Sequence, residues 1–133
     1  MIVCLDTNIV IYFVEGNPLW GPKVTARIAA LRAAGDELAV CDAARLECLV
    51  GPYQIGNAAI MASYAAFFAG AGIRMLPVTV AAWERAARIR ADHQFSALDA
   101  LHLAAAVEHG CAQFLTNDAH LRKFPDISVE ILA

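Results

Sequence analysis

The chain of 133 residues lacks the features of several protein classes. No apolar run reaches the roughly 18 residues that a membrane-spanning helix needs. The four cysteines lie far apart and include no Cys-x-x-Cys pair, which argues against a zinc site or a disulfide framework. There is no glycine pattern for cradling phosphates, and Asp6 interrupts the segment where a secretory leader would lie. We therefore expect one cytoplasmic domain over residues 1–133, with no membrane partner.

Positive charge is also scarce. Ten Lys and Arg residues stand against 13 Asp and Glu residues, and the formal net charge is −3. Proteins that bind nucleic acids by charge alone carry a basic footprint, so such a role here needs local basic patches or a metal. Candidate cations are Lys23, Arg45, Arg85, Arg88 and Arg90, although each is equally explained as part of a solvated helix surface.

Apolar residues are abundant, at 59% of the chain, and they fall into strand-like and helix-like segments that alternate. This alternation predicts an α/β fold with a mostly parallel sheet and helices on both faces. We expect strands at Ile2–Leu5, Leu38–Cys41, Met75–Val78, Gln113–Thr116 and Ser128–Leu132. We expect helices at Val24–Ala34, Ala43–Val50, Asn57–Ala71, Ala81–Ala91, Ala97–His109 and Ala119–Lys123.

One helical segment, Ala58–Ile73, is rich in alanine and aromatic residues. It is too apolar for a helix that buries only one face within its own chain. We therefore expect part of it to meet another subunit in a symmetric homodimer.

Acidic residues follow three of the predicted strands. Asp6 follows the first strand, Asp42 the second and Asp118 the fourth. Ligands of open parallel sheets bind beyond these carboxyl ends. Glu47 and Asp99 are unusual for another reason, because each interrupts an otherwise apolar helical segment.

Each acid also has a simpler explanation when it is taken alone. Asp6 and Asp118 are good helix N-caps, and Asp99 follows Ser96 by three residues, as in a capping box. Glu47 can point to solvent. Both explanations remain open for Asp99, for which they are nearly balanced.

The set of acids favours a metal site more than any member does. Carboxylates gathered at one sheet edge repel each other and raise each other's pKa values, so such a cluster persists most easily around a hard cation. Oxygen ligands favour Mg²⁺ or Mn²⁺ over zinc. A site of this kind activates water and stabilises the charge of a displacement at phosphorus.

Four segments, LDTNIVIYF, LECLVG, LDALHLAAA and TNDAHLRKF, resemble in order and spacing the acidic motifs of the PIN domain, and in particular of the VapC-type ribonuclease toxins. The resemblance runs from Met1 to about Leu132. It implies a three-layer α/β/α sandwich with a mostly parallel sheet of about five strands. It also implies an endoribonuclease that uses Mg²⁺, with Mn²⁺ able to replace it, and that is dimeric and neutralised by a small antitoxin protein.

The resemblance also implies the site residues. The acids that match the motifs, as catalytic residues and metal ligands, are Asp6, Glu47, Asp99 and Asp118. In supporting positions, Asn8 would assist Asp6, and Thr116 is the polar residue near the last acid. Cleavage would leave a 5′-phosphate and a 3′-hydroxyl.

Two residues depart from the pattern or are not explained by it. Asp42 stands before the second motif, where the family often has a small hydroxyl residue, and we leave it out of the catalytic set. His102 follows Asp99 by about one helical turn and can face the same cleft. A buried histidine with satisfied hydrogen bonds is the interpretation we favour for it.

Two other functions compete with the nuclease. A phosphatase of the haloacid dehalogenase type needs a second Asp two residues after the first, and position 8 is Asn8. A catalytically silent PIN-like module that binds RNA or protein remains open. Metal-dependent RNA cleavage that is lost in Asp6→Asn would distinguish the enzyme from this module.

Overall fold

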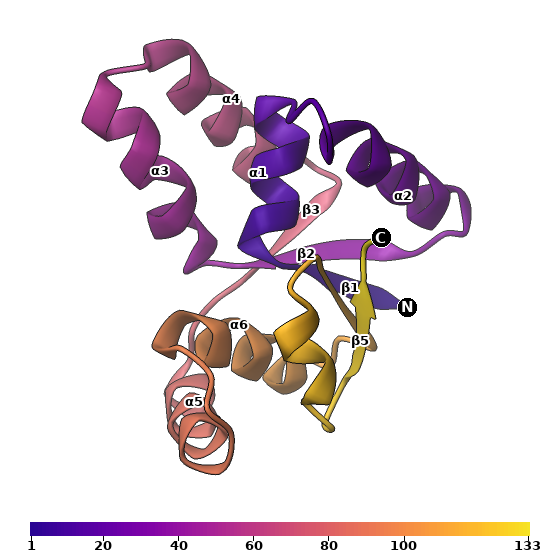
Figure 1. The fold of residues 1–133 in the computed structure, drawn as a ribbon, viewed down its shortest axis with the longest axis vertical. Helices are drawn as coiled ribbons and strands as arrows, with labels where there is room; N and C mark the ends of the chain where they lie inside the picture. Colours follow the sequence, from indigo (N-terminus) through magenta and orange to yellow (C-terminus); the bar gives the residue numbers. More distant parts are fainter.

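In the computed structural model, which describes residues 1–133, five parallel strands form one sheet in the order β3-β2-β1-β4-β5 (Figure 1). The strands are β1 (Ile2–Leu5), β2 (Glu37–Cys41), β3 (Ile73–Leu76), β4 (Gln113–Thr116) and β5 (Ser128–Ile131). The helices are α1 (Thr7–Glu15), α2 (Gly21–Ala33), α3 (Ala44–Ile55), α4 (Ala58–Ala69), α5 (Val80–Asp92), α6 (Ala97–Glu108) and the short 3₁₀ helix η1 (Ala119–Lys123). This architecture confirms the predicted α/β/α sandwich.

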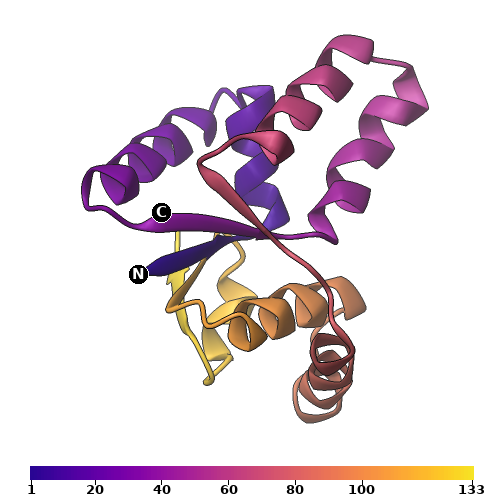
Figure 2. The same cartoon turned by 180° about the vertical axis from the view of Figure 1, so that it is seen from behind.

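The helices divide between the two faces of the sheet. Figure 1 and, from behind, Figure 2 show α1 to α4 on one side and α5, α6 and η1 on the other. Side chains of a strand alternate between its faces, so neighbouring residues of β1 belong to different cores. Val3 and Leu5 pack in the α1–α4 core, whereas Cys4 packs in the α5–α6 core.

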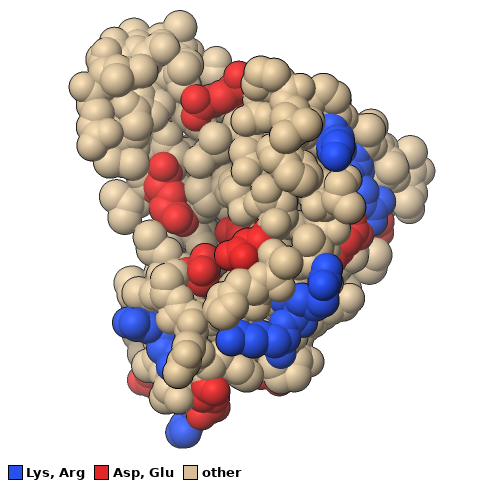
Figure 3. All heavy atoms as spheres, viewed as in Figure 1, with Lys and Arg blue, Asp and Glu red and all other residues tan.

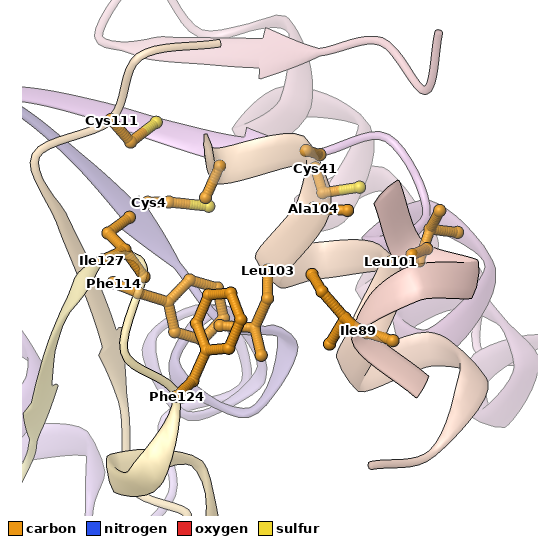
Figure 4. Close-up of a cluster of buried hydrophobic side chains, with 14 of the residues drawn as sticks. Cys4, Cys41, Ile89, Leu101, Leu103, Ala104, Cys111, Phe114, Phe124 and Ile127 are labelled. Atoms are coloured by element: carbon orange, nitrogen blue, oxygen red, sulfur yellow. The ribbon is translucent and has the colours of Figure 1, made fainter. Parts of the chain in front are cut away.

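The core on the α5–α6 side of the sheet draws more of its buried residues from α6 than from any other element (Figure 4). Ala104 and Leu103 are fully buried there, as is Phe114, and Phe124 is nearly so. The cysteines contribute as small apolar groups, because all four are buried free thiols. Cys4 lies on β1 and Cys41 on β2, and both side chains are fully buried.

Several elements differ from the sequence prediction, and three of the differences are instructive. Helix α1 was not predicted, because its first residues belong to the polar motif that follows β1 and were assigned to the site. Helix α3 continues through Gly51-Pro52 to Ile55 and ends at Gly56, whose φ of 65° suits a residue without a Cβ. Strand β3 begins at Ile73, two residues earlier than predicted, and it ends at Leu76, because the next residue, Pro77, has no N–H to continue the ladder.

The apolar segment that was expected to meet another subunit forms α4. Its large side chains Tyr64 and Phe68 are buried within the chain, which leaves mainly alanines exposed on that helix. Several exposed large apolar side chains lie instead on α3, where Leu46 is 65% exposed and Tyr53 is 62% exposed. None of the helices combines the length and apolarity needed to cross a lipid bilayer.

Candidate active site

Asp6 lies where β1 ends and α1 begins. Its side chain is only 5% exposed and accepts two hydrogen bonds, from the Thr7 N–H at 2.8 Å and from the Thr116 hydroxyl at 2.7 Å. Burial raises the pKa of Asp6, and the negative charge of Asp99 raises it further, although His102 and the two hydrogen bonds act the other way. Asp6 is both the N-cap of α1 and a buried acid at the sheet edge.

Thr116, at the end of β4, connects Asp6 to Asp118. Its fully buried hydroxyl donates to Asp6 Oδ2 and accepts from the Asp118 N–H at 3.1 Å. Asp118 in turn caps η1, since its Oδ1 accepts from the His120 N–H at 2.9 Å. Asp118 therefore has the capping role considered from the sequence, and it keeps Oδ2 free of protein hydrogen bonds.

Asp99 lies in the first turn of α6, whose N-cap is Ser96. The Ser96 hydroxyl accepts from the Asp99 N–H at 3.1 Å, as a capping box requires. Burial raises the pKa of the Asp99 carboxyl, a hydrogen bond from Ser96 lowers it, and the charges of Asp118 and Glu47 raise it. Ser96 therefore caps the helix through the N–H of Asp99, and the negative charges of two other acids act on the Asp99 carboxyl.

Glu47 lies in the first turn of α3 and is held by two side chains from other helices. Its Oε1 accepts from the Thr7 hydroxyl at 2.7 Å and lies 2.5 Å from His102 Nε2. Although burial raises the pKa of Glu47, the hydrogen bonds from His102 and Thr7 outweigh this effect and lower it. Burial lowers the pKa of His102, but the Cys41 thiol and Glu47 raise it to about 10. Glu47 and His102 therefore form an ion pair at neutral pH.

The four predicted acids thus lie at the carboxyl edge of the sheet, close enough for their charges to shift one another's pKa values. Asp99 acts on Asp6, and both Asp118 and Glu47 act on Asp99. Figure 3 shows acidic side chains gathered around a hollow between the α3–α4 end of the molecule and the part formed by α5 and α6. Two of these acids lie in helices, Glu47 in α3 and Asp99 in α6, and the other two, Asp6 and Asp118, follow the ends of β1 and β4.

The supporting residues differ from the expected ones. Asn8 makes no hydrogen bond to Asp6, and its buried Oδ1 has no partner. The hydrogen bonds to Asp6 come from Thr116 and from the N–H of Thr7, a residue outside the predicted site. The sequence signal for Thr7 was weak, because its hydroxyl bonds to Glu47, 40 residues away.

Other charged residues were placed less well by sequence reasoning. Asp42 pairs with Arg45 at 3.3 Å, and Arg85 pairs with Glu108 at 2.6 Å. Lys23 lies over the Trp20 ring, 4.9 Å from its centre. Two exposed cations that were not predicted, Arg122 and Lys123, lie on η1, the helix that Asp118 caps.

The donor set suits a hard cation, although it is not arranged as a finished ligand cage. No three Asp, Glu, His or Cys side chains stand together in metal-binding geometry. Glu47 Oε2 and Asp118 Oδ2 nevertheless accept no hydrogen bond from the protein. Burial first, and then the negative charge of neighbouring acids, raises the pKa values of Asp6 and Asp99, and a bound cation would favour their charged forms.

Solved structures with the same fold come from bacterial toxin–antitoxin systems. VapBC2 from Rickettsia felis, bound to promoter DNA, matches with a TM-score of 0.83 and 16% identity over all of both chains. DNA-bound VapBC from Salmonella typhimurium matches with a TM-score of 0.79 and 17% identity, over 100% of this chain and 99% of the other. VapC20 from Mycobacterium tuberculosis, a toxin that cleaves the sarcin–ricin loop, matches with a TM-score of 0.66 and 17% identity, over 84% of this chain and 86% of the other. At these identities the likeness shows the fold.

The family is identified from the amino-acid sequence. No curated protein matches the chain. The family model of the PIN domain, however, matches residues 3–127, which include all four acids and Thr116. Because this match spans nearly the whole sequence, the chain belongs to the PIN domain family.

Proposed function

We propose that the protein is a divalent-metal-dependent endoribonuclease and the toxin of a toxin–antitoxin pair. The observation that carries this proposal is the charge coupling among four acids at the carboxyl edge of the sheet. PIN domains generally depend on divalent metals, and the structural neighbours include an RNA-cleaving toxin. An all-oxygen donor set is consistent with Mg²⁺ as the natural ion and with Mn²⁺ as a substitute.

Asp6, Asp99 and Asp118 would hold the metal, with Glu47 either holding a second ion or orienting the attacking water. When bound, such an ion lowers the pKa of a water molecule and stabilises negative charge on the phosphate. The protein's own contribution is to keep these carboxylates in place. Thr116 does this for two of them, because one hydroxyl bonds both the Asp6 side chain and the Asp118 backbone.

The RNA backbone needs cations, because the net charge of −3 would repel it. Arg122 and Lys123 are the exposed cations nearest in sequence to Asp118. We assign them to phosphate contacts in the proposed enzyme. Phosphate contacts of this kind position a substrate and do not select its sequence.

A small antitoxin and a second copy of the chain are the proposed partners. Solved neighbours are complexes of a toxin with its antitoxin. A basic antitoxin segment placed among the acids would replace the charge of the metal. The exposed apolar side chains of α3, with the alanine face of α4, supply the surface for a symmetric homodimer. Light scattering of the isolated protein tests the dimer, and co-purification from the native operon tests the antitoxin.

The test of the enzyme is RNA cleavage by the purified protein with Mg²⁺, with Mn²⁺ and with EDTA. We expect cleavage with either metal, none with EDTA, and a loss of at least about 100-fold in Asp6→Asn. Asp36→Asn is the matched control, because Asp36 pairs with the amino terminus at 3.1 Å, before β2 begins, and not at the acidic edge. Cleavage that survives both EDTA and Asp6→Asn would refute the proposal.

A silent module that binds RNA or protein is the second candidate. One observation favours it, namely that no three potential ligands are grouped in metal-binding geometry. This candidate predicts that the protein binds RNA, or a co-encoded protein, without cleaving RNA under any metal condition. It also predicts that overexpression of the chain alone is harmless to cells.

A further inference from the structure

His102, Thr7 and Glu47 contact one another in a triangle, and His102 is not one of the four acids of the predicted site. Its Nε2 lies 2.5 Å from Glu47 Oε1 and 3.1 Å from the Thr7 hydroxyl oxygen. That hydroxyl lies 2.7 Å from the same Glu47 oxygen. The three side chains come from α6, α3 and α1, so the triangle ties three helices together at the acidic edge.

Hydrogen-bond chemistry determines where the protons are. The Thr7 hydroxyl and His102 Nε2 both lie within hydrogen-bond distance of Glu47 Oε1, and a carboxylate oxygen accepts hydrogen bonds. The Thr7 hydroxyl gives its single proton to Glu47, so it has none left for His102. Nε2 of His102 must therefore carry a proton and donate it, toward Glu47 Oε1 at the shorter distance.

Packing alone does not account for a histidine at this position. His102 is 1% exposed, and its neighbours on the buried face of α6 are alanines and leucines, which fill such space without polar atoms. Its Nδ1 is buried and has no hydrogen-bond partner, which is a cost that an apolar residue would avoid. A leucine would lose the polar contacts that Nε2 makes with Glu47 and Thr7.

Glu47 is the acid that most needs such support. It projects from an exposed stretch of α3 between Leu46, 65% exposed, and buried Cys48, and it has three rotatable bonds of its own. Both donors act on Oε1, and no protein group hydrogen-bonds Oε2. A carboxylate held by one oxygen presents the other in a constant direction.

We propose that His102, together with Thr7, is a positioning residue that holds Glu47 by Oε1 and thereby presents Oε2 to a divalent ion among the acids. This inference rests on the proposed function, in which those acids bind the metal. His102 itself does not touch the ion or the RNA. Partners that orient a metal ligand in this way commonly change metal affinity by about 10- to 100-fold when removed.

The test is a titration of the RNA-free protein with Mn²⁺, followed by calorimetry or by the electron paramagnetic resonance of free Mn²⁺. We expect His102→Leu to weaken Mn²⁺ binding by about 10- to 100-fold and His102→Gln, whose amide can donate to Oε1, to recover part of the loss. In a Glu47→Gln background, His102→Leu should cause no further loss. A residue with only a structural role would weaken binding equally in both backgrounds.

The matched control is His109→Leu, a histidine at the end of the same helix whose Nε2 bonds the Pro77 carbonyl at 2.8 Å. This variant should bind Mn²⁺ as the wild type does. If His102→Leu fails to fold, by circular dichroism, the comparison of Thr7→Val with Thr7→Ser tests the same triangle, and only Val should weaken binding.

The outcomes separate this inference from the proposed function. Wild-type protein that binds no Mn²⁺ would refute the proposed metal site and this inference with it. Wild-type protein that binds Mn²⁺, with His102→Leu binding equally well or losing affinity independently of Glu47, would refute the positioning role alone.

Discussion

Thr116→Val is the substitution whose effect follows most directly from the structure. Valine has nearly the shape of threonine but lacks the hydroxyl, and position 116 is fully buried. The change removes the 2.7 Å hydrogen bond to Asp6 and the acceptor of the Asp118 N–H at 3.1 Å. A buried polar group left without its partner costs about 1–3 kcal/mol, and the Asp118 N–H, which is only partly buried, costs less, so we expect a loss of about 2–4 kcal/mol in the free energy of unfolding.

For a domain of this size, that loss corresponds to a fall in Tm of roughly 6–16 °C, measurable by calorimetry in the absence of metal. The loss should depend on pH. The Thr116 bond lowers the pKa of Asp6, so Val raises a folded-state pKa that burial already places above 3.8. An acid with a raised folded pKa destabilises the fold as the pH rises through that value, so the deficit should be larger at neutral than at acid pH.

The control for this prediction is Thr116→Ser, which keeps the hydroxyl and should retain most of the stability and activity. Thr116→Val should also lower RNA cleavage by about 10- to 100-fold, because two of the acids lose their support. A Val variant as stable and as active as the wild type at neutral pH would refute the assigned role of this hydroxyl.

Further predictions concern a metal ligand and two contacts outside the site. Asp99→Asn should leave the stability of the metal-free protein unchanged or slightly raised, because burial and neighbouring charges raise the pKa of Asp99. The rise in Tm that Mn²⁺ causes should shrink in this variant. An unchanged rise would leave Asp99 with a purely structural role in the first turn of α6. Arg27→Met should cost about 1 kcal/mol in urea unfolding, because Arg27 binds Glu130 through two hydrogen bonds of 2.7 Å. Since Arg27 lowers the pKa of Glu130, this contribution is present above about pH 4.5 and disappears as the pH falls through the lowered value; a deficit that persists in acid would contradict it. Tyr64→Phe should cost about 1–2 kcal/mol, because the buried ring loses its hydrogen bond to Glu15, and an unchanged Tm would count against that bond.

The sheet was predictable from sequence because its signals are local. Short apolar runs separated by helical segments predict parallel strands, and four of the five strands lie within one residue of their expected bounds at each end. The missed helix α1 shows the limit of this approach. The polar motif that follows β1 also begins this helix, so the same three residues are candidates both for the site and for the start of a helix.

The acids were predictable individually, but their supporting contacts were not. Asp6 and Asp118 could be placed at one sheet edge from topology alone, since strand ends meet there. The triangle of Thr7, Glu47 and His102 joins residues 40 to 95 positions apart, and no periodicity in the sequence reports such contacts. The position of His102 one turn after Asp99 was the only available signal.

The most direct test of the account is a crystal structure of the protein soaked with Mn²⁺, with the ion located by its anomalous scattering. The account predicts an anomalous peak at the carboxyl edge of the sheet, about 2.0–2.3 Å from a carboxylate oxygen of Asp6 and from one of Asp99 or Asp118. A well-diffracting crystal with saturating Mn²⁺ and no peak near Asp6 would contradict the claim that these acids form one metal site.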